Sequence, residues 1–292
     1  MQTILFGIAT ATVWAFADIF IAKSTKVIKP VFAAALVTLL GALVFGIYYL
    51  LFIRLPIPLK VEGIIWSVLS GFFIALASAF FFKALFKGPI GIVSALSSTY
   101  PAVTLLLAIS IFDATITITQ GLGFSMVITG VVAAAGFHAT GNSNESKSKS
   151  SGTWMALFAA GAWGIGYGLL AQGVKVLGWE VASVLQFSAL AFCCLLFILI
   201  MWKPYAISLT AFNGAIKNPF ILAAAATQQG GAILLNIGLS GDSTGGSIVV
   251  ALSACYPVLT TIMAYFYFKE RIPYLALAGG LLAIIGIVTL SL

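Results

Sequence analysis

Asp18 has the clearest chemistry of the chain, because it is the one acidic residue placed well inside a long apolar segment. A carboxyl group in surroundings of low dielectric constant resists ionisation, so it can bind a proton on one side of a membrane and release it on the other. Trp14 lies one helical turn earlier and shares the same helix face. A structural role is the alternative: Lys23 follows about 7 Å further along the helix, where the carboxyl group would be only a hydrogen-bond acceptor near the membrane edge. We name Asp18 as the candidate for proton coupling and leave both interpretations open.

Two tyrosine–proline pairs, Tyr100-Pro101 and Tyr256-Pro257, lie inside two other apolar segments. Proline removes a helical hydrogen bond and clashes with the carbonyl group four residues back, so each pair predicts a helix kink. A carbonyl group freed in hydrocarbon needs a partner, which favours a kink that faces a cavity rather than lipid. We expect both tyrosines to line a substrate-binding cavity; a purely structural kink, sealed by a neighbouring serine, is the alternative.

Primary amides gather in two further apolar segments, as Gln186, Gln228, Gln229 and Asn236. A buried amide without partners is costly, so these groups bind one another, the backbone or a polar ligand. Gln228 precedes a pair of glycines in the middle of its segment, which indicates substrate contact or local unwinding, with helix–helix contact as the alternative. We assign Gln186 and Gln228 to substrate binding.

No pattern in the sequence predicts catalysis, a metal or a cofactor. The three cysteines lack the spacing of a metal site or a disulfide framework. The run 241–245 fits G-x-S-x-G, but it lies in an expected loop, and the sole histidine, His138, begins a different loop. We predict no enzyme activity, no catalytic residue, no metal and no cofactor.

The elements that hold these residues are membrane-spanning helices, because 62% of the chain is hydrophobic and only 7% is charged. This composition excludes a soluble domain. Each expected segment has about 19–23 residues, enough to cross a hydrocarbon core of about 30 Å. The predicted fold is therefore an all-α membrane protein with ten transmembrane helices, at 2–22, 31–53, 63–82, 91–111, 119–138, 153–172, 180–201, 219–239, 246–267 and 273–291.

The charges predict the orientation and the partners. Eleven Lys and Arg residues follow the odd-numbered segments, whereas only three follow the even-numbered ones. This excess places the first set in the cytoplasm and both termini outside it, in a multi-pass protein of the cell membrane. The basic residues that give the net charge of +7 then lie at the membrane edge, where they contact anionic lipid, and we expect no nucleic-acid partner.

The chain contains an internal repeat: residues 95–108 and 251–264 share seven identities in 14 positions. A second correspondence pairs Trp14 with Trp163 and Asp18 with Tyr167. We therefore divide the chain into a first repeat at 1–138, a hydrophilic linker at 139–152 and a second repeat at 153–292. Five helices is an odd number, so the two repeats would be inverted in the membrane, an arrangement that favours secondary transport.

Several of these features resemble the drug/metabolite transporter superfamily, EamA type. They are ten segments in two halves, a Trp in the first and sixth, the Tyr-Pro pairs in the fourth and ninth, and an acidic loop at Glu270 that leads to Gly279 and Gly286. Two departures are visible: Asp113 stands where a Glu is usual, and many members of the family have cytoplasmic termini. The resemblance implies transport of amino acids, sugars, nucleotide derivatives or drugs.

We expect a secondary active transporter that moves a small polar or amphipathic metabolite, such as an amino acid, by alternating access and in the direction of export. Its cavity would be lined by Trp14, Tyr100, Trp163, Tyr167, Gln186, Gln228 and Tyr256. A sugar or drug carrier and a uniporter or exchanger without proton coupling are the alternatives. A channel would need a continuous polar lumen and a membrane enzyme an acid–base pair at one depth, and the sequence shows neither. The sequence does not decide whether the protein is a monomer or a homodimer.

Overall fold

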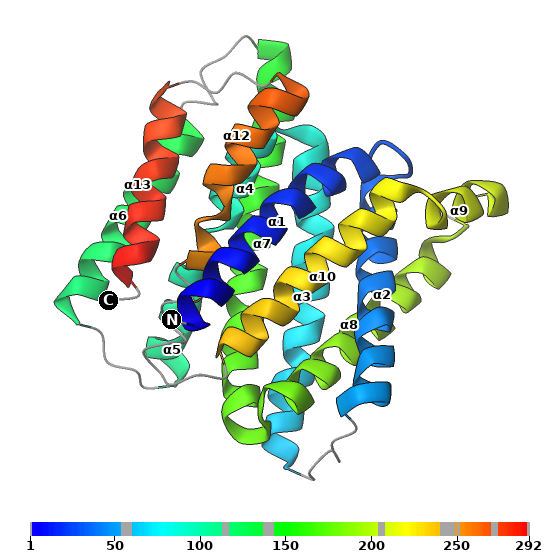
Figure 1. Ribbon diagram of the computed structural model, residues 1–292. Helices are drawn as coiled ribbons and strands as arrows, with labels where there is room; N and C mark the ends of the chain where they lie inside the picture. Colours follow the sequence, from blue (N-terminus) through cyan, green and yellow to red (C-terminus); the bar gives the residue numbers. More distant parts are fainter. Residues whose placement is uncertain are drawn as a thin grey trace.

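The computed structural model describes residues 2–53, 60–112, 117–136, 143–203, 208–239, 249, 252–269 and 274–290. These residues form a bundle of helices, and no strand occurs among them (Figure 1). The N and C marks lie at the same end of the bundle (Figure 1). Many large apolar side chains on the outside are exposed, including Val44 at 68% and Phe266 at 73%, as expected of surfaces that face lipid.

Seven helical stretches are long and apolar enough to cross a membrane, and two shorter apolar helices accompany them among the described residues. This confirms the all-helical membrane fold, while the count of ten spans remains a prediction. The helices are α1 (Gln2–Ser24), α2 (Pro30–Tyr48) with a π-helical turn (Tyr49–Ile53), α3 (Val61–Lys87), α4 (Ile90–Ser97), α5 (Tyr100–Ile111), α6 (Ile118–Gly136), α7 (Ser143–Leu177), α8 (Trp179–Met201), α9 (Leu209–Ile216), α10 (Pro219–Leu239), α12 (Tyr256–Phe268) and α13 (Tyr274–Leu290).

Part of the hydrophilic linker predicted at 139–152 is helical, because α7 begins at Ser143. Once a membrane helix exists, each further residue adds a hydrogen bond without a new nucleus, and this stretch has no proline to stop it. The Lys87 side chain also donates to Ser151 Oγ at 3.2 Å, which ties α7 to the end of α3. Residues 139–142 lie outside the described residues.

The short helix α9 was not predicted; it lies where the sequence indicated a loop. Ser208 begins it by accepting a hydrogen bond from the Ala211 backbone N–H at 3.1 Å, the usual arrangement at a helix start. Because α9 has only eight residues, it is too short to cross a membrane.

The two tyrosine–proline pairs, where the sequence predicted kinks, lie at short interruptions within the helical stretches Ile90–Ile111 and Leu252–Phe268. Each pair stands at the start of the helix that follows the interruption. Pro101 and Pro257 are the second residues of α5 and α12, a position where the missing N–H costs nothing. The residues before the breaks have nearly the same backbone, with φ −77° and ψ 2° at Thr99 and φ −80° and ψ −1° at Cys255. The two interruptions are thus closely similar in shape.

The helices pack in a regular set of pairs. Along their lengths, α3 contacts α7 and α1 contacts α10, while α3 also contacts α8 and α2 contacts α10. The helices α5 and α7 meet, as do α1 and α12, and α6 lies beside α13 at one edge of the bundle (Figure 1).

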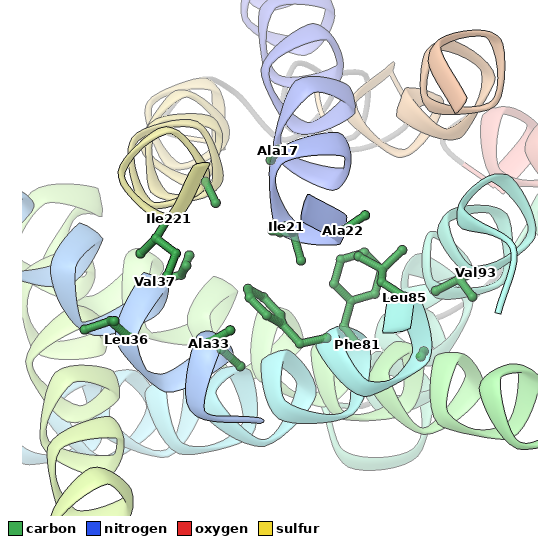
Figure 2. Packing of buried hydrophobic residues seen from close by; sticks show 14 of the residues in the cluster. Ala17, Ile21, Ala22, Ala33, Leu36, Val37, Phe81, Leu85, Val93 and Ile221 are labelled. Atoms are coloured by element: carbon green, nitrogen blue, oxygen red, sulfur yellow. The ribbon is translucent and has the colours of Figure 1, made fainter. Parts of the chain in front are cut away.

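The main core cluster fills the bundle where α1, α2, α3, α4 and α10 converge (Figure 2). Phe81 from α3, Ile21 from α1 and Ile221 from α10 are almost fully buried in it. Alanines such as Ala17, Ala22 and Ala33 let the backbones approach closely, which is how membrane helices gain packing contacts.

Four glycines make the contact between α6 and α13 reciprocal. A side chain on Gly130 would meet the backbone of Gly279, and one on Gly286 would meet the backbone of Gly123. Such a crossing, in which each helix offers the same groove to the other, is typical of a two-fold relation.

We expect Gly130→Val to destabilise the protein by about 1–3 kcal/mol, because its Cβ would lie 2.5 Å from backbone atoms of α13. Gly121→Val is the matched control on the same helix, since nothing lies within 4 Å of its added Cβ. Thermal unfolding in detergent measures both variants. Equal loss of stability in the two would contradict this packing.

Candidate functional site

A cavity of about 620 Å³, counted to its open mouth, lies inside the bundle. It borders the main core cluster through Ile21 and Phe81, and a second, smaller cluster through Ile74 and Phe187. Fifteen residues from α1, α3, α5, α7, α8, α10 and α12 line it. Helices from both halves of the chain therefore build one interior site.

Asp18 lies on the cavity wall and is only 3% exposed. Its Oδ2 accepts hydrogen bonds from Ser94 Oγ on α4 and from Thr260 Oγ1 on α12, the latter at 3.1 Å. One carboxyl oxygen thus joins three helices. Any change in its charge acts directly on the contacts between α1, α4 and α12.

Tyr256 is held beside this carboxyl group by the broken end of α4. Its hydroxyl lies 3.2 Å from Ser97 Oγ and donates to the Ser94 carbonyl oxygen at 3.4 Å. In the other half, the Tyr100 hydroxyl is directed at Ser253, without a hydrogen bond of good geometry. Each tyrosine therefore faces the serine that precedes the other tyrosine by three residues.

Trp14 connects α1 to α10. Its Nε1 donates to the Gln228 carbonyl oxygen at 3.2 Å, and its ring meets Tyr256 edge-on with 5.8 Å between centroids. Gly231 gives the indole its room, because a side chain there would overlap the Trp14 ring. The glycine pair therefore does not unwind α10, which is continuous from Pro219 to Leu239, and this corrects the unwinding considered from the sequence.

Two of the amides are held in place by serines, and three keep unused acceptor atoms. Gln186 Nε2 donates to Ser70 Oγ at 3.2 Å, and Asn236 Nδ2 donates to Ser183 Oγ at 2.8 Å. The oxygens Gln186 Oε1 and Gln228 Oε1 are buried without a hydrogen-bond partner in the structure, although both residues line the cavity. Unpaired buried acceptors of this kind invite a ligand that donates hydrogen bonds.

Aromatic rings form most of the remaining wall. Tyr100 and Tyr167 lie 5.1 Å apart between ring centroids, and Phe81 and Trp163 lie 4.9 Å apart. Phe187 adds a further ring from α8. The site combines broad apolar faces with one acid and a few amides, the composition usual in small-molecule sites.

All eight residues that the sequence singled out for binding or coupling line this one cavity. The prolines do not: Pro101 is buried elsewhere, and Pro257 borders a separate apolar groove near α13. The sequence analysis missed several residues of the site, of which Ser94 and Thr260 hold the acid, Ser70 holds an amide, and Phe81 and Phe187 form part of the wall. Within the described part of the chain, no group of three or more His, Cys, Asp or Glu residues could hold a metal ion.

Comparison with known proteins shows which proteins the chain is similar to in sequence and in fold. Residues 1–136 match the EamA-like transporter family. An uncharacterized transporter of Archaeoglobus fulgidus is 26% identical over 305 residues, covering 100% of this chain and 99% of that protein. An uncharacterized protein of Methanocaldococcus jannaschii is 27% identical over 129 residues, which are 44% of this chain and 93% of that protein. A solved crystal structure with 20% identity shares the fold at a TM-score of 0.57, over 99% of this chain and 96% of that one.

The chain thus has several helices long and apolar enough to cross a membrane, as in a multi-pass membrane protein. Its first half is an EamA-like unit of the drug/metabolite transporter superfamily, which confirms the resemblance drawn from the sequence.

Proposed function

We propose that the protein is a secondary active transporter that moves a small polar or amphipathic metabolite, such as an amino acid, by alternating access around the cavity. The observation that carries the proposal is the cavity itself, where one buried acid, three amides and seven aromatic residues from both halves meet inside the bundle. Asp18 is the proposed coupling group, because it is the acidic residue of the cavity and links its own helix α1 to α4 and α12.

The packing supports an arrangement of two inverted five-helix repeats, at 1–138 and 153–292. Exchanging α1 with α7, α2 with α8, α3 with α10 and α5 with α12 turns four contacting helix pairs into four others that also occur: α3–α7 into α1–α10, α3–α8 into α2–α10, α5–α7 into α1–α12, and α2–α3 into α8–α10. The two similar helix interruptions, one before Tyr100 and one before Tyr256, also correspond to each other under this exchange. The Methanocaldococcus jannaschii protein matches 44% of this chain over 93% of its own length. A protein of that size is consistent with a single unit that was duplicated in this chain.

Alternating access follows from this symmetry, because two similar halves can trade conformations and open the cavity to each side in turn. A sugar or drug carrier of the same fold and a carrier without proton coupling are the other candidates. A continuous polar lumen, which a channel would need, is at odds with the aromatic wall of the cavity.

Counterflow in proteoliposomes tests the function. Separate preparations of vesicles are loaded with unlabelled amino acids, amines, sugars or nucleosides, and each is then given the matching labelled compound. For one of these compound classes, the labelled compound should accumulate transiently above its equilibrium level. Protein-free vesicles are the control. Equilibration without overshoot for every class would reject a carrier.

The orientation is a separate prediction. Lys23 lies in the last turn of α1 and Lys26 in the turn that follows it, and Lys83 and Lys87 lie in the last turns of α3. These residues are therefore at the end of the bundle that the basic excess assigns to the cytoplasm. A reporter fused after Leu292 should be active only outside the cytoplasm. Activity of a cytoplasmic reporter at that position would reverse the assignment.

A further inference from the structure

The cavity carries one negative group and no positive one among the described residues that line it. Asp18 is its single acid, and neither Lys nor Arg contributes to the wall. The basic residue closest in the chain, Lys23, is engaged elsewhere: its Nζ lies 4.8 Å from the Phe220 ring centroid and 5.2 Å from that of Tyr267. An anionic cargo would find no counter-charge on these side chains.

The breaks before α5 and α12 do not replace the missing positive charge. Helix starts in mid-membrane can bind anions through free N–H groups. Here the second residue of each helix is a proline, and the next N–H groups already bond the chain: Ala102 to the Thr99 carbonyl oxygen at 3.0 Å, and Val258 to that of Cys255 at 3.2 Å. Each break is closed on itself, which leaves few donors for a carboxylate.

The wall favours a cation instead. Seven of its residues are aromatic, and ring faces attract cations through their negative quadrupole. A cation enclosed by these rings would meet the Asp18 carboxylate, the only charge that the described wall offers. This pairing removes the cost of leaving either charge alone in a site with little water.

The unused amide oxygens add a second requirement. Gln186 Oε1 and Gln228 Oε1 are buried acceptors without partners, and Ser70 fixes the Gln186 amide from its other end. A protonated primary or secondary amine has N–H groups to donate to such acceptors, whereas a quaternary ammonium group has none. A cargo without donors would leave both oxygens unpaired.

The duplication shows that the acid is not required by the fold. In the second repeat, Tyr167 stands at the position of Asp18 and Val250 at that of Ser94, whereas Thr104 matches Thr260. Thr104 donates to the Gly164 carbonyl oxygen at 2.9 Å, so the same residue type has a purely structural contact where no acid is present. The charged half of the site is therefore a feature of this cavity rather than of the repeat.

We propose that the cargo is a protonated primary or secondary amine that lacks a carboxylate, with Asp18 as its counter-charge and the two glutamine oxygens as acceptors of its N–H groups. This rests on the proposed function, and it narrows the cargo from metabolites in general, and from zwitterionic amino acids, to amines.

Binding to the purified full-length protein in detergent tests the class. Each of three scaffolds, based on ethylamine, 2-phenylethylamine and 2-(indol-3-yl)ethylamine, is compared with its α-carboxylated, N,N,N-trimethylated and hydroxyl analogues by isothermal titration calorimetry. On at least one scaffold, the amine should bind roughly tenfold or more tightly than all three analogues, the range expected of a charge-assisted hydrogen bond. Equal or tighter binding of the carboxylated, trimethylated or hydroxyl compound on every scaffold, or no amine binding on any, overturns the proposal.

Two variants separate the roles of the residues. Asp18→Asn should weaken binding of the amine roughly tenfold or more, while Gln228→Leu should narrow the preference for the amine over its trimethylated analogue. Thr104→Val, the counterpart of Thr260 in the other half, should leave both unchanged. Unaltered amine affinity in folded Asp18→Asn would refute the counter-charge.

Transport in proteoliposomes distinguishes failure of this proposal from failure of the proposed function. Amine binding without counterflow would reject the transporter and keep the ligand class. Counterflow of a carboxylated or neutral compound, with no amine bound, would keep the transporter and reject the class.

Discussion

Replacing Asp18 by Asn should abolish accumulation of cargo driven by a pH gradient. Asparagine keeps an oxygen that can accept from Ser94 and Thr260, so the junction of α1, α4 and α12 retains its hydrogen bonds. It cannot bind and release a proton, however. A pH difference of one unit sustains a cargo ratio of about tenfold when one proton is coupled, and this ratio should fall to about one in the variant.

Exchange in the absence of a pH gradient is the internal control for this variant. With cargo supplied well above its weakened affinity, Asp18→Asn should still exchange labelled for unlabelled compound, which shows that the protein is folded and inserted. Thr260→Val is the companion variant, because it removes one hydrogen bond to the carboxyl group but leaves the acid able to titrate. It should slow accumulation without abolishing it. Full accumulation by Asp18→Asn would show that another ion, or none, drives transport.

The helices were predictable because the membrane imposes a simple pattern. Spans such as α1 and α8 are long runs with few charges, and the sequence placed their ends within a few residues. The repeated Tyr-Pro pairs also pointed to the site, since duplication marks both of its halves at once. What the sequence lacked was any sign that proline would begin a helix rather than bend one, because that depends on how the preceding turn closes.

The partners of the acid could not be predicted. Serine and threonine within helices commonly bond to the carbonyl group one turn back, as Thr104 and Ser67 do, so their presence in an apolar segment indicates no particular partner. Ser94 lies 76 residues from Asp18 in the chain, and Thr260 lies 242 residues away. Only the mutual packing of α1, α4 and α12 brings the three together.

The two tyrosines at the helix breaks should be needed for transport. Tyr100→Ala and Tyr256→Ala each remove a ring that lines the cavity, and a buried aromatic contact of this kind is worth more than about 1.4 kcal/mol, or about tenfold in rate or affinity. The effects should differ in one respect. Tyr256→Ala also removes the contacts of the Tyr256 hydroxyl to Ser97 and Ser94, so it should be less stable than Tyr100→Ala.

The phenylalanine variants separate ring from hydroxyl. Tyr100→Phe should keep the unfolding temperature of the parent, because the Tyr100 hydroxyl makes no hydrogen bond of good geometry, whereas Tyr256→Phe should lower it. Tyr265→Ala is the control on α12 itself, since that ring is 57% exposed on the outside of the bundle and its loss should not affect transport. If Tyr100→Ala and Tyr265→Ala transport equally well, the rings at the breaks serve packing alone, and the cavity does not bind the cargo through them.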